Sequence, residues 1–206
     1  MVDDQIQARG VRDSRVLDAM RKVPRHLFVP TDRIEEAYDD HPILLEEHQS
    51  TISQPYIVAY MTEALQLKED ERVLEVGAGS GYQAAILATL AREVYAVERY
   101  PTQSQKTGER LKTLGYDNVA VITGDGSLGL EQHAPFEAII VTAAAREIPV
   151  PLKEQLAVGG RLVIPVGSAH SQTLIRLTRT GRDDYRREDL IPCVFVPLVS
   201  SDSDTG

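Results

Sequence analysis

The segment from Val73 to Tyr82 constrains this chain more than any other part of the sequence. It reads V-L-E-V-G-A-G-S-G-Y, so a run typical of a buried β-strand leads directly into three alternate glycines, Gly77, Gly79 and Gly81. Glycine lets the backbone approach a ligand closely, and the N-terminus of a following helix offers unpaired N–H groups. Open α/β sheets bind ligands beyond the carboxyl ends of their strands. The segment therefore predicts an α/β protein with a ligand site at this loop.

The spacing of the glycines selects among cofactors. A dinucleotide-binding loop has the pattern G-x-G-x-x-G, and its third glycine would stand at the position of the bulky Tyr82. The third glycine here is Gly81, and the pattern E-x-G-x-G-x-G matches the first motif of S-adenosylmethionine-dependent methyltransferases. We expect Glu75 and the glycine loop to hold the methionine end of that cofactor. A merely tight turn is the alternative interpretation of the loop taken alone.

The rest of the chain indicates the fold class. From residue 72 onward, short apolar runs alternate with helix-length stretches, which is the pattern of βαβ units around a parallel sheet. The antiparallel end of the sheet is predicted from the alternating residues 172–178 and the apolar run 191–198. We predict a doubly wound, mostly parallel α/β sheet with strands at 72–76, 93–97, 118–122, 137–142 and 161–166, and helices at 81–90, 103–114 and 152–157.

The residues before this core show a helical pattern and no alternation of strands and helices. Val16, Leu17 and Met20 stand at helical spacing, and a second helix is expected from about residue 56 to 65, after a loop from 42 to 55. We interpret residues 1–199 as a single domain. Its parts are an N-terminal helical cap with a substrate loop (1–65) and the α/β core (72–199), and the polar residues 200–206 are expected to be disordered.

Acidic residues follow the second and third predicted strands. Glu98 ends the strand V-Y-A-V-E about 20 residues after Gly77, which is the position of a ribose-binding carboxylate. Asp125, between Gly124 and Gly126, could accept a hydrogen bond from an adenine amino group while a backbone N–H meets a ring nitrogen. A helix cap and a β-turn are the alternative interpretations of the two acids. Three consecutive strand ends that all suit an adenosyl group favour the cofactor site.

The fourth predicted strand ends in small residues. It runs into Thr142, Ala143, Ala144 and Ala145, and offers neither a base nor a nucleophile. Methyl transfer to a nitrogen or a hydroxyl has to manage a proton, whereas a carboxylate is already ionised at neutral pH. A carboxylate acceptor therefore needs only positioning, and small residues would give room to a peptide main chain. Ordinary packing of alanines in the core is the alternative.

A hydroxyl-rich segment, S-T-I-S-Q-P at residues 50–55, leads into the helix expected from residue 56. Ser53 is its residue of interest. As an N-cap it would stabilise that helix by about 1 kcal/mol, and a proline soon after fits the first helical turn. Alternatively, its hydroxyl donates to a substrate carboxylate or helps to orient the cofactor. The sequence leaves both interpretations open.

The composition of the chain limits the classes of partner that we expect it to bind. The formal net charge of −9 would repel nucleic acid. One cysteine, Cys193, allows no intramolecular disulfide and no cysteine-based metal cluster, and no histidine has metal-ligand spacing, so we expect no metal. No apolar run reaches the roughly 20 residues of a membrane span, and the first residues lack the basic head of a signal peptide. We expect a cytoplasmic protein with neither a membrane nor a nucleic-acid partner.

In this order along the chain, these motifs resemble the protein-L-isoaspartate O-methyltransferase family over almost the whole sequence. The resemblance begins with V-P-R-H-L-F-V-P at residues 23–30 and continues to F-V-P-L at 195–198. The S-T-I-S-Q-P segment discriminates best, because many methyltransferases share the glycine loop. The family implies methyl transfer from S-adenosylmethionine, leaving S-adenosylhomocysteine, to the free α-carboxylate of L-isoaspartyl residues in damaged proteins, which is the first step of their repair.

The resemblance also implies roles for individual residues. Ser53 occupies the position usually assigned as the active site. Two departures from the family pattern concern substrate binding, namely Glu47, where glycine is common, and a polar tail after Leu198 that is shorter than in some members. Contacts are expected to the cofactor from Glu75, Gly77, Ala78, Gly79, Gly81, Glu98, Asp125 and Gly126, and to the substrate from Thr51, Ile52, Ala143, Ala144 and Val196.

Three other functions compete with this one. A nicotinamide-dependent oxidoreductase would use the same type of fold, although Tyr82 argues against it. A non-catalytic binding or sensing module would keep the cofactor pocket, and Ser53 would then be dispensable. A methyltransferase for a small-molecule carboxyl or hydroxyl acceptor is excluded only by the family resemblance.

Overall fold

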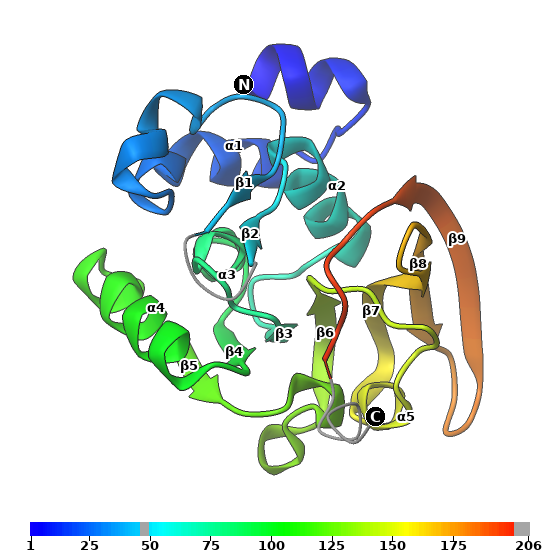
Figure 1. The fold of residues 1–206 in the computed structure, drawn as a ribbon. Helices are drawn as coiled ribbons and strands as arrows, with labels where there is room; N and C mark the ends of the chain where they lie inside the picture. Colours follow the sequence, from blue (N-terminus) through cyan, green and yellow to red (C-terminus); the bar gives the residue numbers. More distant parts are fainter. Residues whose placement is uncertain (46–49, 200–206) are drawn as a thin grey trace.

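A seven-stranded sheet forms the centre of the computed structural model, which describes residues 1–45 and 50–199. The strand order is β5-β4-β3-β6-β7-β8-β9, with β3 to β7 parallel and the last two strands antiparallel (Figure 1). This confirms the predicted mostly parallel sheet with an antiparallel end. The strands are β3 (Arg72–Val76), β4 (Glu93–Glu98), β5 (Val119–Thr123), β6 (Phe136–Val141), β7 (Leu156–Ser168), β8 (Ser171–Arg179) and β9 (Tyr185–Cys193).

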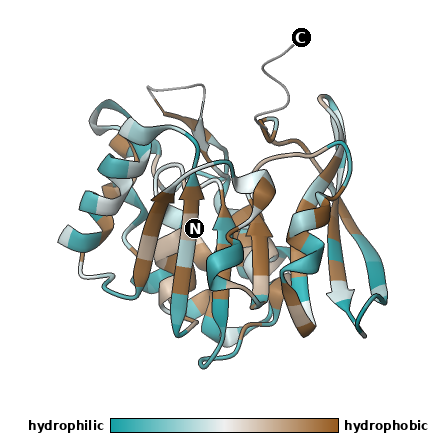
Figure 2. Cartoon of the chain, turned by 90° about the horizontal axis from the view of Figure 1, so that it is seen from below, coloured by the Kyte–Doolittle hydropathy of each residue, from teal (hydrophilic) through white to brown (hydrophobic). Residues whose placement is uncertain are grey.

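The helices cover the two faces of the sheet unequally. On one face α1 to α4 pack over Val73, Val94 and Ala138, while the other face, with Leu74 and Ile139, is covered mainly by α5 and short 3₁₀ turns. Alternate residues of a strand point to opposite faces, so both faces need apolar side chains. In Figure 2 the colour of apolar residues is accordingly concentrated in the inner strands of the sheet. The helices are α1 (Ser14–Lys22), α2 (Pro55–Leu65), α3 (Tyr82–Ala88), α4 (Pro101–Thr113) and α5 (Val150–Glu154).

The N-terminal part is helical, as the sequence predicts, but most of its helical segments are short. Its buried residues Ile6, Val16 and Met20 pack onto the face of the sheet that carries α2 and α3. No helix among the described residues is long and apolar enough to cross a membrane. Besides α1 and α2, the short turns of this part are η1 (Val2–Ile6), η2 (Gln7–Arg9), η3 (Arg25–Leu27) and η4 (Thr31–Glu36).

A small hairpin lies within residues 42–55, which the sequence predicts as a loop. Strands β1 (Ile43–Leu44) and β2 (Thr51–Ile52) pair antiparallel, with Ile43 opposite Ile52. Two-residue strands carry too little periodicity to be recognised from sequence. The hairpin matters because β2 leads directly into Ser53. The predictions about Glu47 and about residues 200–206 lie outside the described residues.

Two predictions near the C-terminus are wrong in position. The helix expected at residues 152–157 is the shorter α5, and Leu156 already begins β7. The last strand is β9 rather than the apolar run 191–198. β9 is an edge strand that pairs only with β8, and charged residues such as Arg186 and Glu188 occupy it, so it lacks an apolar pattern. The apolar residues that follow form an extended segment beside β6, described below.

Candidate active site

The site lies where the strand order reverses, between β3 and β6. Strands β4 and β5 continue the sheet on one side of this pair, and β7 to β9 continue it on the other side. Such a switch point separates the loops that follow neighbouring strands, so it leaves a crevice at their carboxyl ends. The glycine loop follows β3, and Thr142 follows β6, so both reach this crevice.

The glycine loop is held close to both neighbouring strands. The amides of Gly77 and Ala78 donate to the carbonyl of Val97 at 2.9 and 3.2 Å. Gly77 has a φ of +95°, and a Cβ there would lie 2.5 Å from Oγ1 of Thr142. The hydroxyl of Thr142 donates to the Gly77 carbonyl at 2.7 Å. Gly77 is therefore required both by its backbone conformation and by the approach of Thr142, a residue that the sequence analysis did not single out.

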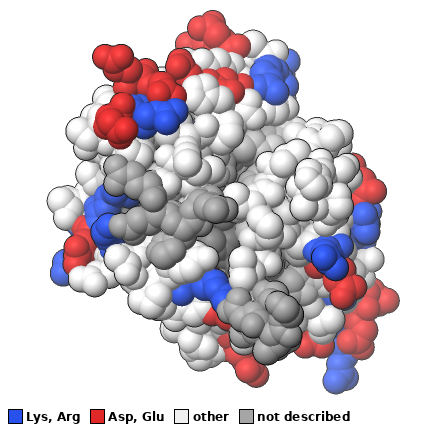
Figure 3. Space-filling view, in the orientation of Figure 1, with Lys and Arg blue, Asp and Glu red and all other residues white. Residues whose placement is uncertain are grey.

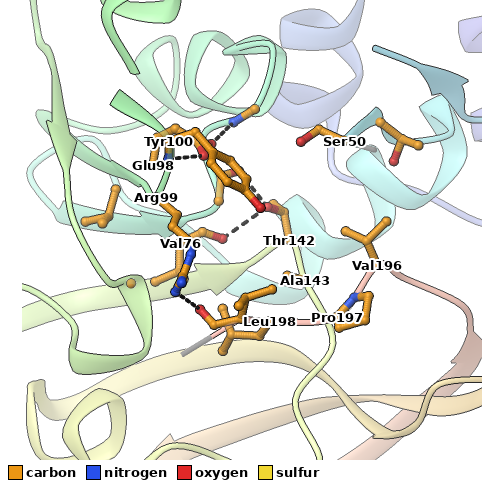
Figure 4. Close-up of a pocket in the computed structure, with 16 residues that line it drawn as sticks. Ser50, Val76, Glu98, Arg99, Tyr100, Thr142, Ala143, Val196, Pro197 and Leu198 are labelled. Carbon is orange, nitrogen blue, oxygen red and sulfur yellow. Dashed lines mark hydrogen bonds between the residues drawn. The ribbon is translucent and has the colours of Figure 1, made fainter. Parts of the chain in front are cut away.

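Glu98 joins the loop to the start of α4. One of its carboxylate oxygens accepts from the Gly79 amide at 2.9 Å, and the other accepts from the Tyr100 amide at 3.1 Å (Figure 4). Tyr100 precedes the first turn of α4, so Glu98 binds the chain before the helix and does not cap a first-turn amide. The same carboxylate faces the crevice. A carboxylate has about four acceptor positions, so two remain for ribose hydroxyls.

The Gly79 carbonyl is fixed from the other side by two further residues. Gln103 Nε2 and Thr107 Oγ1, both on α4, each donate to it at 2.6 Å. Their position on a polar stretch of helix gave no sequence signal. The amide of Gly79 is thus bound by Glu98, and its carbonyl is bound by Gln103 and Thr107. These bonds hold the loop in place without a ligand.

We predict that Glu98→Ala weakens the binding of S-adenosylhomocysteine by about 10-fold or more, because a charged hydrogen-bond acceptor contributes about 1.5–3 kcal/mol. Glu98→Gln keeps one oxygen acceptor and should lose less affinity. Isothermal titration calorimetry measures both variants, and thermal melting shows whether the loop is retained. Equal affinity in the parent and in Glu98→Ala would show that Glu98 serves the loop alone.

Beside Glu98 lies a hollow that opens to solvent, with Val76, Thr142 and Ala143 among its lining residues (Figure 4). Of the predicted cofactor contacts, Gly77, Gly79, Glu98 and Gly126 line it. Gly126 lies so close to Val76 that a Cβ would collide with the valine side chain. In Figure 3 most of the charged side chains lie around the rim of the face shown.

Asp125 is not among the residues that line this hollow. Its Oδ1 accepts from the amide and the hydroxyl of Ser127, at 2.9 and 2.6 Å, and so begins the short turn η5 (Gly126–Leu128). The turn interpretation of Asp125 is therefore supported by these bonds. Its contact with adenine stays a prediction.

Glu75 is fully buried at the end of β3. Neither oxygen of its carboxylate has a hydrogen-bond partner among the described residues. Burial, and after it the negative charge of Glu98, raise the pKa of the Glu75 carboxyl well above its ordinary value of 4.5. It borders a smaller hollow together with Ser53, Gly77 and Thr142. An unpaired buried acceptor next to the glycine loop is a suitable partner for the amino group of a methionine moiety.

Ser53 lies between this smaller hollow and a larger groove. It lines both, and the groove has Tyr56 on one wall and Phe195 on the other. The interpretation of Ser53 as a helix cap is wrong, because α2 begins after Gln54, and Asp40 instead accepts from the Tyr56 amide at 3.1 Å. The hydroxyl of Ser53 is thus not used in capping.

The remaining predicted substrate contacts lie on both sides of the same region. Thr51 lines both hollows and the groove, and Ile52 lines the smaller hollow. Ala143 and Val196 line the larger hollow (Figure 4). The amide of Ala144 donates to the Val196 carbonyl at 2.8 Å, so its main chain pairs with the chain's own C-terminal segment. The C-terminal segment therefore occupies the space beside Ala144 that was predicted for a peptide main chain.

The C-terminal segment contributes wall residues that the sequence analysis did not assign. Pro197 and Leu198 line the larger hollow, and the Leu198 amide donates to the Ala144 carbonyl at 2.7 Å. Arg99 Nη1 donates to the Val199 carbonyl at 3.2 Å and so connects this wall to the end of β4. No local signal marks these residues, because their place depends on a pairing between Ala144, in the segment after β6, and residues 196–198.

Fold and site together define a class of protein. A mostly parallel sheet with the loop G-x-G-x-G after β3, a carboxylate at the end of β4 and a hollow lined by both is the arrangement of an S-adenosylmethionine-dependent methyltransferase.

Comparison with known proteins identifies the family. The model of the family Protein-L-isoaspartate(D-aspartate) O-methyltransferase (PCMT) matches residues 1–203. The chain is 55% identical to protein-L-isoaspartate O-methyltransferase 2 of Pelobacter propionicus, over 98% of this chain and 90% of that one. The chain therefore belongs to the protein-L-isoaspartate O-methyltransferase family, as the resemblance predicts.

Two solved structures of this family resemble the fold of the chain. One protein-L-isoaspartate O-methyltransferase superposes with a TM-score of 0.86 at 26% identity, covering 97% of this chain and 66% of that one. A second, from Plasmodium falciparum and solved in complex with S-adenosyl-L-homocysteine, gives a TM-score of 0.83 at 28% identity and covers 96% of each chain.

Proposed function

We propose that this protein transfers a methyl group from S-adenosylmethionine to the free α-carboxylate of L-isoaspartyl residues in damaged proteins and peptides. The observation that carries the proposal is the place of Ser53, which borders both the hollow of Glu75 and the groove beside Tyr56. A hydroxyl at this border can hold a carboxylate from the groove and direct it toward the cofactor. The family of the chain and the names of its relatives support the same activity.

The residues present fit this cofactor. When bound, S-adenosylmethionine supplies an electrophilic methyl group on a sulfonium centre. Glu75 would accept from the amino group, and this would give its buried carboxylate the partner that it lacks. Glu98 would accept from the ribose hydroxyls. Gly126 lies so close to Val76 that a Cβ would collide with the valine, so the turn after β5 can reach the hollow only with glycine at this position.

Ser53 is proposed to position the acceptor. Its hydroxyl would donate to one carboxylate oxygen and leave the other aligned for in-line attack. No general base is needed, because the carboxylate is ionised at neutral pH. Orientation of this kind is worth about 7–11 kcal/mol, so alignment supplies most of the catalysis.

The alternative as a nicotinamide oxidoreductase does not fit this structure or family. Tyr82 is 1% exposed, and its ring packs edge-on against Phe28 at 5.6 Å, so the start of α3 is filled by a core side chain. We further propose a cytoplasmic setting with isoaspartyl proteins as partners. The net charge of −9 supports a partner other than nucleic acid.

The proposed function predicts that the protein methylates an isoaspartyl peptide and not its aspartyl twin of the same sequence. The reason is that the site must receive a carboxylate attached directly to the α-carbon. Transfer of radiolabelled methyl groups to the two peptides measures this. Equal labelling of both peptides, or labelling of neither, would overturn the substrate assignment.

A further inference from the structure

Asp40 makes a cluster of contacts next to the Ser53 segment that no sequence motif signals. Its Oδ2 accepts from Nε2 of Gln54 at 2.8 Å, and its backbone carbonyl accepts from the same amide at 2.9 Å. Its Oδ1 accepts from the Tyr56 amide at 3.1 Å. The carboxylate also forms an ion pair with Arg9. One side chain thus binds both residues that flank Pro55 at the beginning of α2.

These contacts provide the helix cap that was one of the two interpretations of Ser53. The first amides of a helix have no partner within it, and a carboxylate near them also suits the helix dipole. In most helices the cap is the adjacent residue, but here Asp40 reaches the start of α2 from a distant part of the chain. Capping from a distance leaves the Ser53 hydroxyl available to a substrate.

Arg9 completes the cluster on the outer side. Its guanidinium lies 3.6 Å from the centre of the Tyr56 ring, and it is paired with Asp40. Arg9, Gln54 and Tyr56 all line the groove that Ser53 borders. The ion pair, the stacked ring and the helix start therefore form one continuous wall beside the proposed acceptor site.

Ser53 lies between two anchored points. On one side Ile52 pairs with Ile43 in the β1–β2 hairpin. On the other side Gln54 is bound by Asp40. The hairpin fixes only the chain before Ser53, so the direction in which the chain leaves that residue depends on Gln54 and on its bond to Asp40.

We propose that Asp40, held by Arg9, is a positioning residue for methyl transfer, because it fixes the Ser53–Gln54 segment relative to α2. The proposal rests on the proposed function, in which Ser53 receives the substrate carboxylate. Asp40 acts through Ser53 and does not line the cofactor hollows. A displacement of about 1 Å at such a segment can lower the rate about 100-fold.

The test compares three variants at a temperature where all are folded. Asp40→Ala removes every side-chain contact and should lower kcat for an isoaspartyl peptide about 10-fold to 100-fold. The affinity for S-adenosylhomocysteine should stay at the parent value, because the glycine loop and Glu98 are untouched. Asp40→Asn keeps an oxygen for the Tyr56 amide, and asparagine caps helices as well as aspartate does. Its Nδ2 cannot accept from Gln54 or pair with Arg9, so Gln54 keeps only its bond to the backbone carbonyl of residue 40. The kcat of Asp40→Asn should therefore fall between that of Asp40→Ala and that of the parent.

Asp13 offers a matched control. It caps α1 by accepting from the amides of Arg15 and Val16, and it lines none of the hollows described here. Asp13→Ala should lower the melting temperature about as much as Asp40→Ala does, since each removes one helix cap. Its kcat and KM should match those of the parent.

Each outcome decides the question. A fall in kcat for Asp40→Ala, an intermediate kcat for Asp40→Asn and parent kinetics for Asp13→Ala support the positioning role. Parent kinetics for Asp40→Ala, or an equal fall in Asp13→Ala, would overturn it. A parent protein that does not methylate the isoaspartyl peptide at all would instead overturn the proposed function, and the same assay detects this before any variant is compared.

Discussion

Replacing Ser53 with aspartate is expected to leave the protein folded and to lower kcat/KM for an isoaspartyl peptide about 100-fold or more. The new carboxylate would face the incoming carboxylate of the substrate. Two like charges 4 Å apart repel by about 4 kcal/mol near a protein surface, and 1.36 kcal/mol corresponds to a factor of ten in rate. The fold should tolerate the change because Asp40, and not Ser53, caps α2.

Two further variants separate the charge from the loss of the hydroxyl. Ser53→Ala removes only the donor and should lower kcat about 10-fold, which corresponds to about 1.4 kcal/mol of transition-state stabilisation. Ser171→Asp introduces the same charge at the exposed first residue of β8 and should leave the kinetics unchanged. Parent activity in a folded Ser53→Asp protein would remove Ser53 from the active site.

The sequence places the glycine loop, Glu98 and Gly126 at one edge of the sheet because its signals there are local. Gly77 follows β3, Glu98 ends β4 and Gly126 comes shortly after β5, and parallel strands bring their carboxyl ends to one edge. Once a parallel sheet is inferred from the alternation of elements, the three loops must meet. The fold class and the cofactor follow from the same pattern, and the family match confirms both.

The proposed substrate-binding half of the site is harder to predict from the sequence, because it is built from contacts between distant parts of the chain. Asp40 reaches α2 from a different turn, and Val196 pairs with Ala144 across more than 50 positions of the chain. Nothing near Asp40 distinguishes it from the neighbouring acids. The same reason explains the misplaced last strand, since β9 is defined by its pairing with β8 rather than by its own apolar pattern.

Glu75→Gln is expected to weaken cofactor binding and, at the same time, to stabilise the ligand-free protein. Loss of a charged acceptor for the cofactor's amino group should lower the affinity for S-adenosylhomocysteine about 10-fold to 100-fold, since such a bond contributes about 1.5–3 kcal/mol. In the free protein, however, the same carboxylate is buried without a partner among the described residues. Removing its charge should raise the melting temperature by about 2–4 °C for each kcal/mol gained.

The pH dependence of this stabilisation has a definite sign. Burial raises the pKa of the Glu75 carboxyl in the folded protein well above 4.5, whereas in the unfolded chain it is ordinary. Above pH 4.5 the unfolded chain therefore loses a proton that the folded protein retains, so ionisation favours unfolding. The contribution of Glu75 to stability falls as the pH rises toward the folded-state pKa. Glu75→Gln lacks this contribution, so its advantage in melting temperature should grow over the same range.

Glu71 provides the matched control, because it is a buried glutamate with a partner. Its carboxylate accepts two hydrogen bonds from Arg161, at 2.8 and 2.9 Å. Glu71→Gln breaks a buried ion pair, which costs about 3–5 kcal/mol, and should lower the melting temperature without changing affinity for S-adenosylhomocysteine. The two Glu→Gln variants thus shift stability in opposite directions, and only Glu75→Gln weakens binding. A lower melting temperature for Glu75→Gln, or unchanged affinity, would contradict the assignment of Glu75 to the cofactor.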